Sequence, residues 1–153
     1  MGDGTTYGIN FPFRDSLRGD YLDLTNTANQ EIRADLINLL LTRKGARYYL
    51  PDFGTRLYEF IFEPMDGLTF DAIESDIRDN VEKYIPNLLI NSITIEPLDP
   101  SEEAEEDDIV SDQPSPVYRY PGKGVAEYTA KVKIDYSVQS STFASSDFVI
   151  INI

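Results

Sequence analysis

The 153-residue sequence contains no cysteine and no histidine. Without cysteine the chain forms no disulfide bond and no thiolate metal site, which agrees with assembly in a reducing cytoplasm. Without histidine, any acid–base catalysis would fall to carboxylates. The sequence has no apolar run of about 18 residues, so we expect no helical membrane span. Its N-terminus also lacks the basic and apolar regions of a secretion signal, so we expect none.

Positive charge is also scarce. The chain has 27 acidic and 13 basic residues and a net charge of −14, which disfavours contact with nucleic acid or an anionic membrane. Eight acidic residues and no basic ones lie in residues 99–116. This segment lacks the spacing of a calcium-binding loop, and we interpret it as a disordered or loosely held acidic loop. We expect no metal site and no cofactor.

The length fits one domain, in which about two-thirds of the unfolded surface could be buried. Residues 1–24 are rich in glycine and aromatic residues without a sustained period, and they predict an extended N-terminal arm. The apolar residues of this arm either cover the chain's own domain or insert into a neighbour. Residues 25–153 are expected to form a single domain that contains the acidic loop.

Three helices are predicted from apolar spacing and end signals. The first begins at Thr25 or Thr27 and ends with Gly45 as its left-handed stop. A short helix over residues 55–62 follows. The third has Thr69 as its N-cap, with Leu68 packing on the next turn, and ends before Pro86. The apolar faces of the first and third helices consist of Ile32, Leu36, Leu39 and Leu40, and of Ile73, Ile77, Val81 and Tyr84.

From residue 88 onward the sequence pattern is typical of β-strands. Residues 88–96 alternate only partially, whereas residues 125–138 alternate between apolar and polar side chains throughout. We expect residues 117–120 and 125–138 to form a hairpin and residues 148–153 to form a terminal strand. These patterns predict an α+β fold, with two or three helices packed on a small, mostly antiparallel sheet.

Residues 42–64 are dense in glycine, proline and aromatic residues, and this composition indicates a shaped docking surface. Arg47 and Arg56 could pair with carboxylates of a partner, pair with local acids such as Asp52 or Glu59, or simply be solvated. Most of the aromatic side chains are expected in the core. One or two exposed tyrosines, among Tyr48, Tyr49 and Tyr58, would be natural interface anchors.

The order of motifs resembles a known family. A helix ending in Thr42-Arg43-Lys44-Gly45-Ala46-Arg47 is followed by Pro51-Asp52-Phe53-Gly54-Thr55, Phe62-Glu63-Pro64, the Thr69 helix and Tyr84-Ile85-Pro86. This pattern is similar to the lysozyme-like baseplate wedge proteins of contractile phage tails, which have relatives in type VI secretion baseplates. The resemblance covers about residues 25–97 strongly and the later strands loosely. Many members have Glu-Pro-Arg where this chain has Ile85-Pro86-Asn87.

The resemblance implies a structural, non-enzymatic role in the inner baseplate of a phage virion, assembled in the host cytoplasm. It implies binding to other wedge proteins, to the tail sheath protein, and to central hub or tube-initiating proteins, with six copies per baseplate. Contacts at Pro86 and Asn87 are expected to be less ionic than in the family. A baseplate subunit of another injection machine is an alternative. The predicted partner-binding residues are Arg47, Pro51, Phe53, Arg56, Tyr84, Pro86, Asn87, Phe148 and Ile150.

The terminal strand suggests a mechanism for the start of sheath assembly. An exposed sheet edge presents unpaired N–H and C=O groups to which an incoming strand can bind. The apolar run Phe148–Ile153 and the strand 125–138 are the candidates for such an edge, and an ordinary strand inside the chain's own sheet is the alternative.

A carboxylate-dependent, lysozyme-like glycoside hydrolase is a second hypothesis. It requires one carboxyl with a raised pKa and a second carboxyl within about 5–9.5 Å. Within residues 42–64, Asp52, Glu59 and Glu63 are the available candidates. Nothing in the sequence brings two of them together, and solvated or capping acids explain them more simply.

Overall fold

The computed structural model of the chain describes residues 8–9, 24–25, 27–60, 66–97, 117–119, 130–139 and 145–153. Most of the predicted arm, the acidic loop 99–116, the predicted hairpin turn and Glu63 lie outside the described residues. Two strand segments of the arm are described: β1 (Gly8–Ile9) and β2 (Leu24–Thr25) pair antiparallel. They contact the first helix, so this part of the arm lies on the chain's own domain.

Helix α1 spans Ala28–Leu41. Of the two predicted N-caps, Thr25 and Thr27, the structure has Thr27. Its side chain accepts a hydrogen bond from the backbone N–H of Gln30 at 3.2 Å. The predicted apolar face is confirmed, since Leu36, Leu39 and Leu40 are fully buried.

The predicted end of α1 is wrong. The helix stops at Leu41, because Thr42 adopts an extended conformation (φ −86°, ψ 128°). The Thr42 hydroxyl also donates a hydrogen bond to the backbone carbonyl of Asn38, one of the carbonyls left open at the helix end. Gly45 has the expected left-handed φ of 89°, but it serves a turn in the following loop and does not end the helix.

Helix α2 is short and spans Leu57–Phe60. Leu57 is fully buried, while Tyr58 and Phe60 pack against the core from partly buried positions. The segment 61–65 that follows lies outside the described residues.

Helix α3 spans Gly67–Tyr84 and begins earlier than predicted. Asp66, not Thr69, is its N-cap, because the Asp66 carboxylate accepts a hydrogen bond from the backbone N–H of Thr69 at 3.0 Å. The predicted packing of Leu68 is also wrong, since 81% of this residue is exposed. The apolar face is confirmed, and the helix ends at Tyr84 because Pro86 disfavours helical geometry at the residue before it.

In the described part of the chain, four strands form the main sheet, in the order β3-β5-β6-β4. Their bounds are Leu88–Pro97 for β3, Val117–Arg119 for β4, Ala130–Val138 for β5 and Ser145–Asn152 for β6. The pairs β3–β5 and β5–β6 are antiparallel, as the predicted fold class requires. Over the residues that the structure describes, the predicted hairpin is not formed, because β4 pairs in parallel with β6 and not with β5.

An irregularity in β3 explains its weak alternation. The register against β5 shifts between Ile90 and Ser92, which leaves Asn91 as an extra residue. A bulge of one residue moves the following side chains to the opposite face. Leu88 and Ile90 therefore share the inner face with Ile93 and Ile95, although their sequence positions differ in parity.

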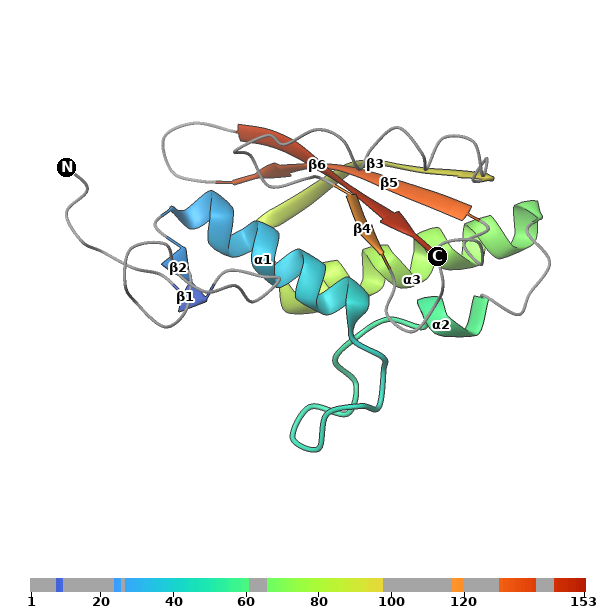
Figure 1. Cartoon of the computed structure of the whole chain (residues 1–153), viewed down its shortest axis with the longest axis horizontal. Coiled ribbons are helices and arrows are strands. Elements are labelled where there is room, and N and C mark those ends of the chain that lie inside the picture. The colour runs from blue at the N-terminus through green and yellow to red at the C-terminus, as the bar shows by residue number, and fades with distance from the viewer. Residues whose placement is uncertain are drawn as a thin grey trace.

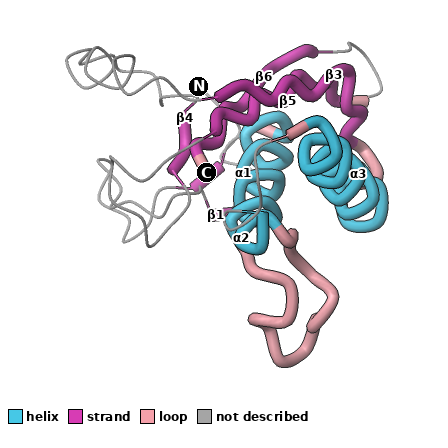
Figure 2. The backbone as a smooth tube through the Cα atoms, turned by 90° about the vertical axis from the view of Figure 1, so that its right-hand side faces the viewer, coloured by secondary structure: helices cyan, strands magenta, loops and turns pink. Residues whose placement is uncertain are grey.

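Helices α1 and α3 pack side by side beneath one face of the sheet, which gives two layers (Figure 1, Figure 2). The core lies between these layers. It joins the apolar faces of both helices to the inward side chains of β5, which alternate without interruption from Ala130 to Val138, and of β6. The α+β architecture predicted from the sequence is therefore confirmed.

Candidate functional site

The loop from Thr42 to Arg56 projects away from both layers, below the end of α1 (Figure 2). Its two ends are joined by backbone hydrogen bonds: Thr55 N–H donates to the Thr42 carbonyl at 3.0 Å, and Lys44 N–H donates to the Thr55 carbonyl at 3.1 Å. The buried Thr55 hydroxyl donates to the carbonyl of Leu40 at 2.9 Å. These bonds hold the base of the loop against the last turn of α1.

The tip of the loop carries large side chains that the core does not use. Tyr48 is 101% exposed, Tyr49 is 98% exposed and Leu50 is 49% exposed. We call residues 48–50 the loop tip. Exposed tyrosines were expected from the sequence, but none of these three residues was among the predicted partner-binding residues. The composition shows that the segment has surplus aromatics, and only the fold shows which of them are outside the core.

Three of the predicted partner-binding residues come together behind the tip. The Arg47 guanidinium lies 4.2 Å from the centroid of the Phe53 ring. The Phe53 ring packs edge-on against Tyr84 of α3, with 5.1 Å between the ring centroids and 70° between their planes. Arg47 also donates to the Asn38 side chain at 3.3 Å. This stack fixes the loop against both α1 and α3.

Pro51 is exposed beside the tip, and its carbonyl accepts a hydrogen bond from Gly45 N–H at 2.7 Å. This bond closes the loop across its width. Among the described residues, Arg47 pairs with no carboxylate, so the local ion pair that the sequence offered as an alternative is not formed there.

Arg56, in contrast, uses a local acid. Its side-chain Nε donates to the Glu59 carboxylate at 2.6 Å, and its backbone N–H donates to Asp76 of α3 at 2.8 Å. The hydrogen bond from Arg56 lowers the pKa of the Glu59 carboxyl, with a further contribution from the hydroxyl of Tyr58. A general acid in glycoside hydrolysis needs the opposite shift, so Glu59 is not suited to that role.

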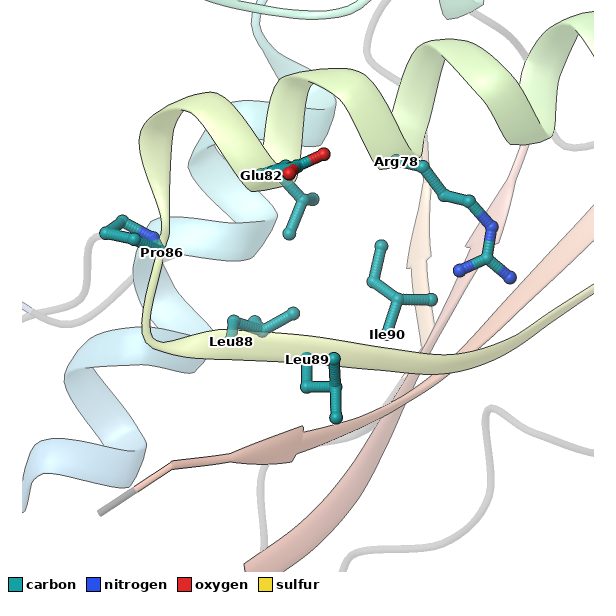
Figure 3. Close-up of a pocket in the computed structure, with 7 residues that line it drawn as sticks. Arg78, Glu82, Pro86, Leu88, Leu89 and Ile90 are labelled. Atoms are coloured by element: carbon teal, nitrogen blue, oxygen red, sulfur yellow. The ribbon is translucent and has the colours of Figure 1, made fainter. Parts of the chain in front are cut away.

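Pro86 and Asn87 form the turn between α3 and β3, and both are exposed. Beside this turn is a hollow of about 600 Å³ between the last turns of α3 and the first residues of β3 (Figure 3). Ile90 points toward the helix, whereas Leu89 points to the other side of the strand and is 52% exposed. We call this hollow the α3–β3 groove; it is lined by Arg78, Val81, Glu82, Pro86, Leu88, Leu89 and Ile90.

The two predicted residues of the terminal strand lie on the outer face of the sheet, away from the helices. Phe148 is 38% exposed, with the Lys133 ammonium 5.1 Å from its ring centroid. Ile150 is 9% exposed, and β6 is paired at this residue on both sides, with β5 and with β4. The terminal strand is therefore internal over residues 150–152, while residues 145–149 have no second neighbour among the described strands.

The edges of the sheet also differ from the expectation. Strand β5, the other predicted candidate, has β3 on one side and β6 on the other, so it offers no edge. Within the described part of the chain, β3 pairs only with β5, and its second side is open over all ten residues. Sequence reasoning missed β3 as an edge strand, because strand order depends on pairings between distant segments.

The described residues hold no group of three or more acidic side chains placed to bind a metal ion. None of the described helices is both long enough and apolar enough to cross a bilayer.

A family model described as baseplate wedge protein gp25 matches residues 26–110, which is more than half of the chain. Over 69 residues the chain is 33% identical to baseplate wedge protein gp25 of Enterobacteria phage T4. That alignment covers 45% of this chain and 52% of the T4 protein. The chain thus spans about half the length of the curated relative it matches.

Two solved structures share the fold. One is provisionally described as a tail lysozyme from Geobacter sulfurreducens; its TM-score is 0.55 at 19% identity, covering 84% of this chain and 94% of that one. The other is a chain of the anti-feeding prophage baseplate, determined with six-fold symmetry. Its TM-score is 0.54 at 16% identity, covering 94% of this chain and 82% of that one.

Proposed function

Because the chain belongs to the baseplate wedge protein gp25 family, we propose that it is a structural subunit of the inner baseplate of a contractile phage tail, not an enzyme. The match over residues 26–110 is the observation that carries this proposal. The 33% identity to the phage T4 protein favours a phage tail over another injection machine. The anti-feeding prophage baseplate was solved with six-fold symmetry, which supports six copies of this subunit per baseplate.

The α3–β3 groove is our candidate contact with the core of the wedge. It combines an apolar floor with two charged side chains, Arg78 and Glu82. Arg78 already forms an ion pair with Glu74 at 2.8 Å. Pro86 and Asn87 border the groove without adding charge, so shape and apolar area contribute more to this contact than ion pairs do.

Sheath assembly is proposed to begin at the open edge of β3, where a strand of the sheath protein adds to the sheet. Over ten residues, no described strand pairs with this edge, and its exposed side chains include Ser92, Thr94 and Glu96. It lies on a strand anchored to the core through Ile93 and Ile95. An edge held by a packed domain keeps its hydrogen-bonding groups in a fixed row, as a template requires.

Site-specific photo-cross-linking tests this function. A photoreactive phenylalanine analogue is placed at Thr94 on β3 or, in a matched variant, at Phe148 on β6, and tail particles are assembled and irradiated. We expect cross-links to the sheath protein from Thr94. If Phe148 cross-links to the sheath protein and Thr94 does not, the sheath strand adds at residues 145–149 of β6 and not at β3. If purified tail particles do not contain this chain, that result contradicts the baseplate role itself.

The hydrolase alternative receives no support from its two described candidates, Asp52 and Glu59. Glu59 is held ionised by Arg56, and Asp52 is exposed with the Lys83 ammonium at 4.0 Å. Glu63 lies outside the described residues. A cell-wall hydrolysis assay of the wild type and Glu63→Gln checks the proposal, because lysis by the wild type that the variant loses would overturn it.

A further inference from the structure

The loop tip is the most exposed apolar feature of the described chain. Tyr48 and Tyr49 are exposed almost completely, and Leu50 is half exposed, all within three consecutive residues. Isolated exposed apolar side chains are ordinary on protein surfaces, but adjacent aromatic ones are typical of interface anchors. The proposed wedge contact and the β3 edge do not include this tip.

The loop that carries the tip is held in one shape. Gly45 N–H donates to the Pro51 carbonyl at 2.7 Å, and Phe53 N–H donates to the Leu50 carbonyl at 3.0 Å. The stack of Arg47, Phe53 and Tyr84 joins the loop to α3. A tip ordered in advance loses little conformational entropy on binding, so more of its contact energy appears as affinity.

The loop is also a basic region of an acidic protein. Residues 43–56 hold four of the 13 basic residues and only one of the 27 acidic ones. Arg43, Lys44 and Arg47 are exposed, and within the described chain none of them forms an ion pair with a carboxylate. Arg43 instead lies over the Tyr58 ring, 5.1 Å from its centroid. Positive charge therefore surrounds the base of an apolar tip.

We propose that the loop tip docks into an apolar recess, bordered by carboxylates, on a different protein subunit of the baseplate. Tyr48 and Tyr49 fill the recess, and Lys44 and its neighbouring arginines face the carboxylates. This inference rests on the proposed function and adds the chemistry of one partner. Buried aromatic side chains supply most of the affinity in such contacts, and the surrounding charges set orientation and partner choice.

Two other occupants define the alternative outcomes of the experiment. A second copy of this chain would meet the tip with a different part of its surface, and such head-to-tail contacts generate rings or open filaments of the free protein. An anionic membrane would attract the loop but repel the rest of a chain with a net charge of −14. Both occupants are distinguishable outcomes of the experiment.

The experiment places the photoreactive phenylalanine analogue at Tyr48 of the full chain, and at Leu68 in a matched control. Leu68 is also a highly exposed apolar residue, but it lies at the start of α3. Tail particles are purified and irradiated, and the cross-linked peptides are sequenced. We expect Tyr48, and not Leu68, to cross-link to a peptide of another baseplate protein that contains or adjoins acidic residues.

A charge variant completes the test. Lys44→Glu should reduce the Tyr48 cross-link by about tenfold, because the reversed charge faces the carboxylates of the partner. The control Lys131→Glu, on β5, should leave the yield unchanged. Tyr48 cross-links to a second copy or to lipid, or no Tyr48 cross-links at all, would overturn this inference. Sheath cross-links from Thr94 in the same particles would show that the proposed function survives that failure.

Discussion

Gly54 determines the shape of the exposed loop more directly than any other single residue near it. Its φ is 119°, in the region that side chains with a Cβ rarely adopt. A Cβ at this position would lie 2.5 Å from the Thr42 carbonyl oxygen and 2.9 Å from the backbone of residues 43 and 44. The absence of a side chain thus lets the two ends of the loop approach each other.

We predict that Gly54→Ala lowers the free energy of unfolding by about 2–3 kcal/mol, because strain and a backbone clash add together. Gly45→Ala is the matched control. Its φ is 89°, but nothing lies within 4 Å of an added Cβ, so only the strain of about 1–2 kcal/mol applies. Urea unfolding of both variants measures the difference. Equal losses would show that the close approach at Gly54 carries no cost.

The sequence alone did not show which residues Arg47 and Arg56 contact. Arg56 pairs with Glu59 three residues away on the same chain, which a local reading of the sequence allowed. Arg47 stacks on Phe53 and reaches Asn38, because the loop folds back on α1. The contact of Arg56 could be predicted from the sequence, whereas the contacts of Arg47 depend on the path of the loop.

At the scale of single elements, the beginning of α3 depends on one carboxylate. The hydrogen bond from the Thr69 backbone N–H to Asp66 lowers the pKa of the Asp66 carboxyl from its ordinary value of 3.8. A carboxyl with a lowered folded-state pKa stabilises the folded protein above its unfolded-state pKa. That contribution is lost as the pH falls through the folded-state pKa.

Asp66→Ala should therefore lower the melting temperature at pH 7 by a few degrees, and the gap from the wild type should narrow as the pH falls below about 3.8. Asp66→Asn is the control, because its amide oxygen still caps the helix but does not titrate. Calorimetry across this pH range measures the gap. A gap that stays constant down to about pH 3 would contradict the cap.

Elements with strong periodicity were predictable and their ends were not. The buried faces of α1, α3 and β5 follow directly from apolar spacing, since burial of one face imposes that period. The bulge at Asn91 removes the same signal from β3. At the start of α3, Asp66 and Thr69 are both good caps, and only hydrogen-bond geometry distinguishes them.

At the scale of the whole molecule, the largest error of the sequence-based prediction was the order of the strands in the sheet. Val117–Arg119 and the strand after it have the sequence of a hairpin, yet β4 pairs with β6 in parallel. Such pairings between distant segments depend on packing that local patterns do not encode. The error affects the functional interpretation. The two predicted template strands, β5 and β6, both have neighbours in the sheet, so the proposed template is now β3.

The terminal strand is part of the core, so its role in assembly requires point changes and not truncation. Deleting residues 147–153 would remove Val149, Ile151 and Ile153, all of them fully buried. The truncated chain would lose its fold together with any binding surface. Failure of the sheath to assemble on it would then say nothing about strand addition.

Ile151→Ala measures how much this strand contributes to the shared core. Ile151 is 0% exposed and belongs to the cluster that joins both helices to the sheet, so the truncation should lower the free energy of unfolding by about 2–5 kcal/mol. Leu68→Ala, at a residue 81% exposed, should change it by less than about 0.5 kcal/mol. Guanidinium unfolding gives both values. A small loss at Ile151, comparable with that at Leu68, would mean that β6 is held loosely and could leave the sheet to pair with a neighbour.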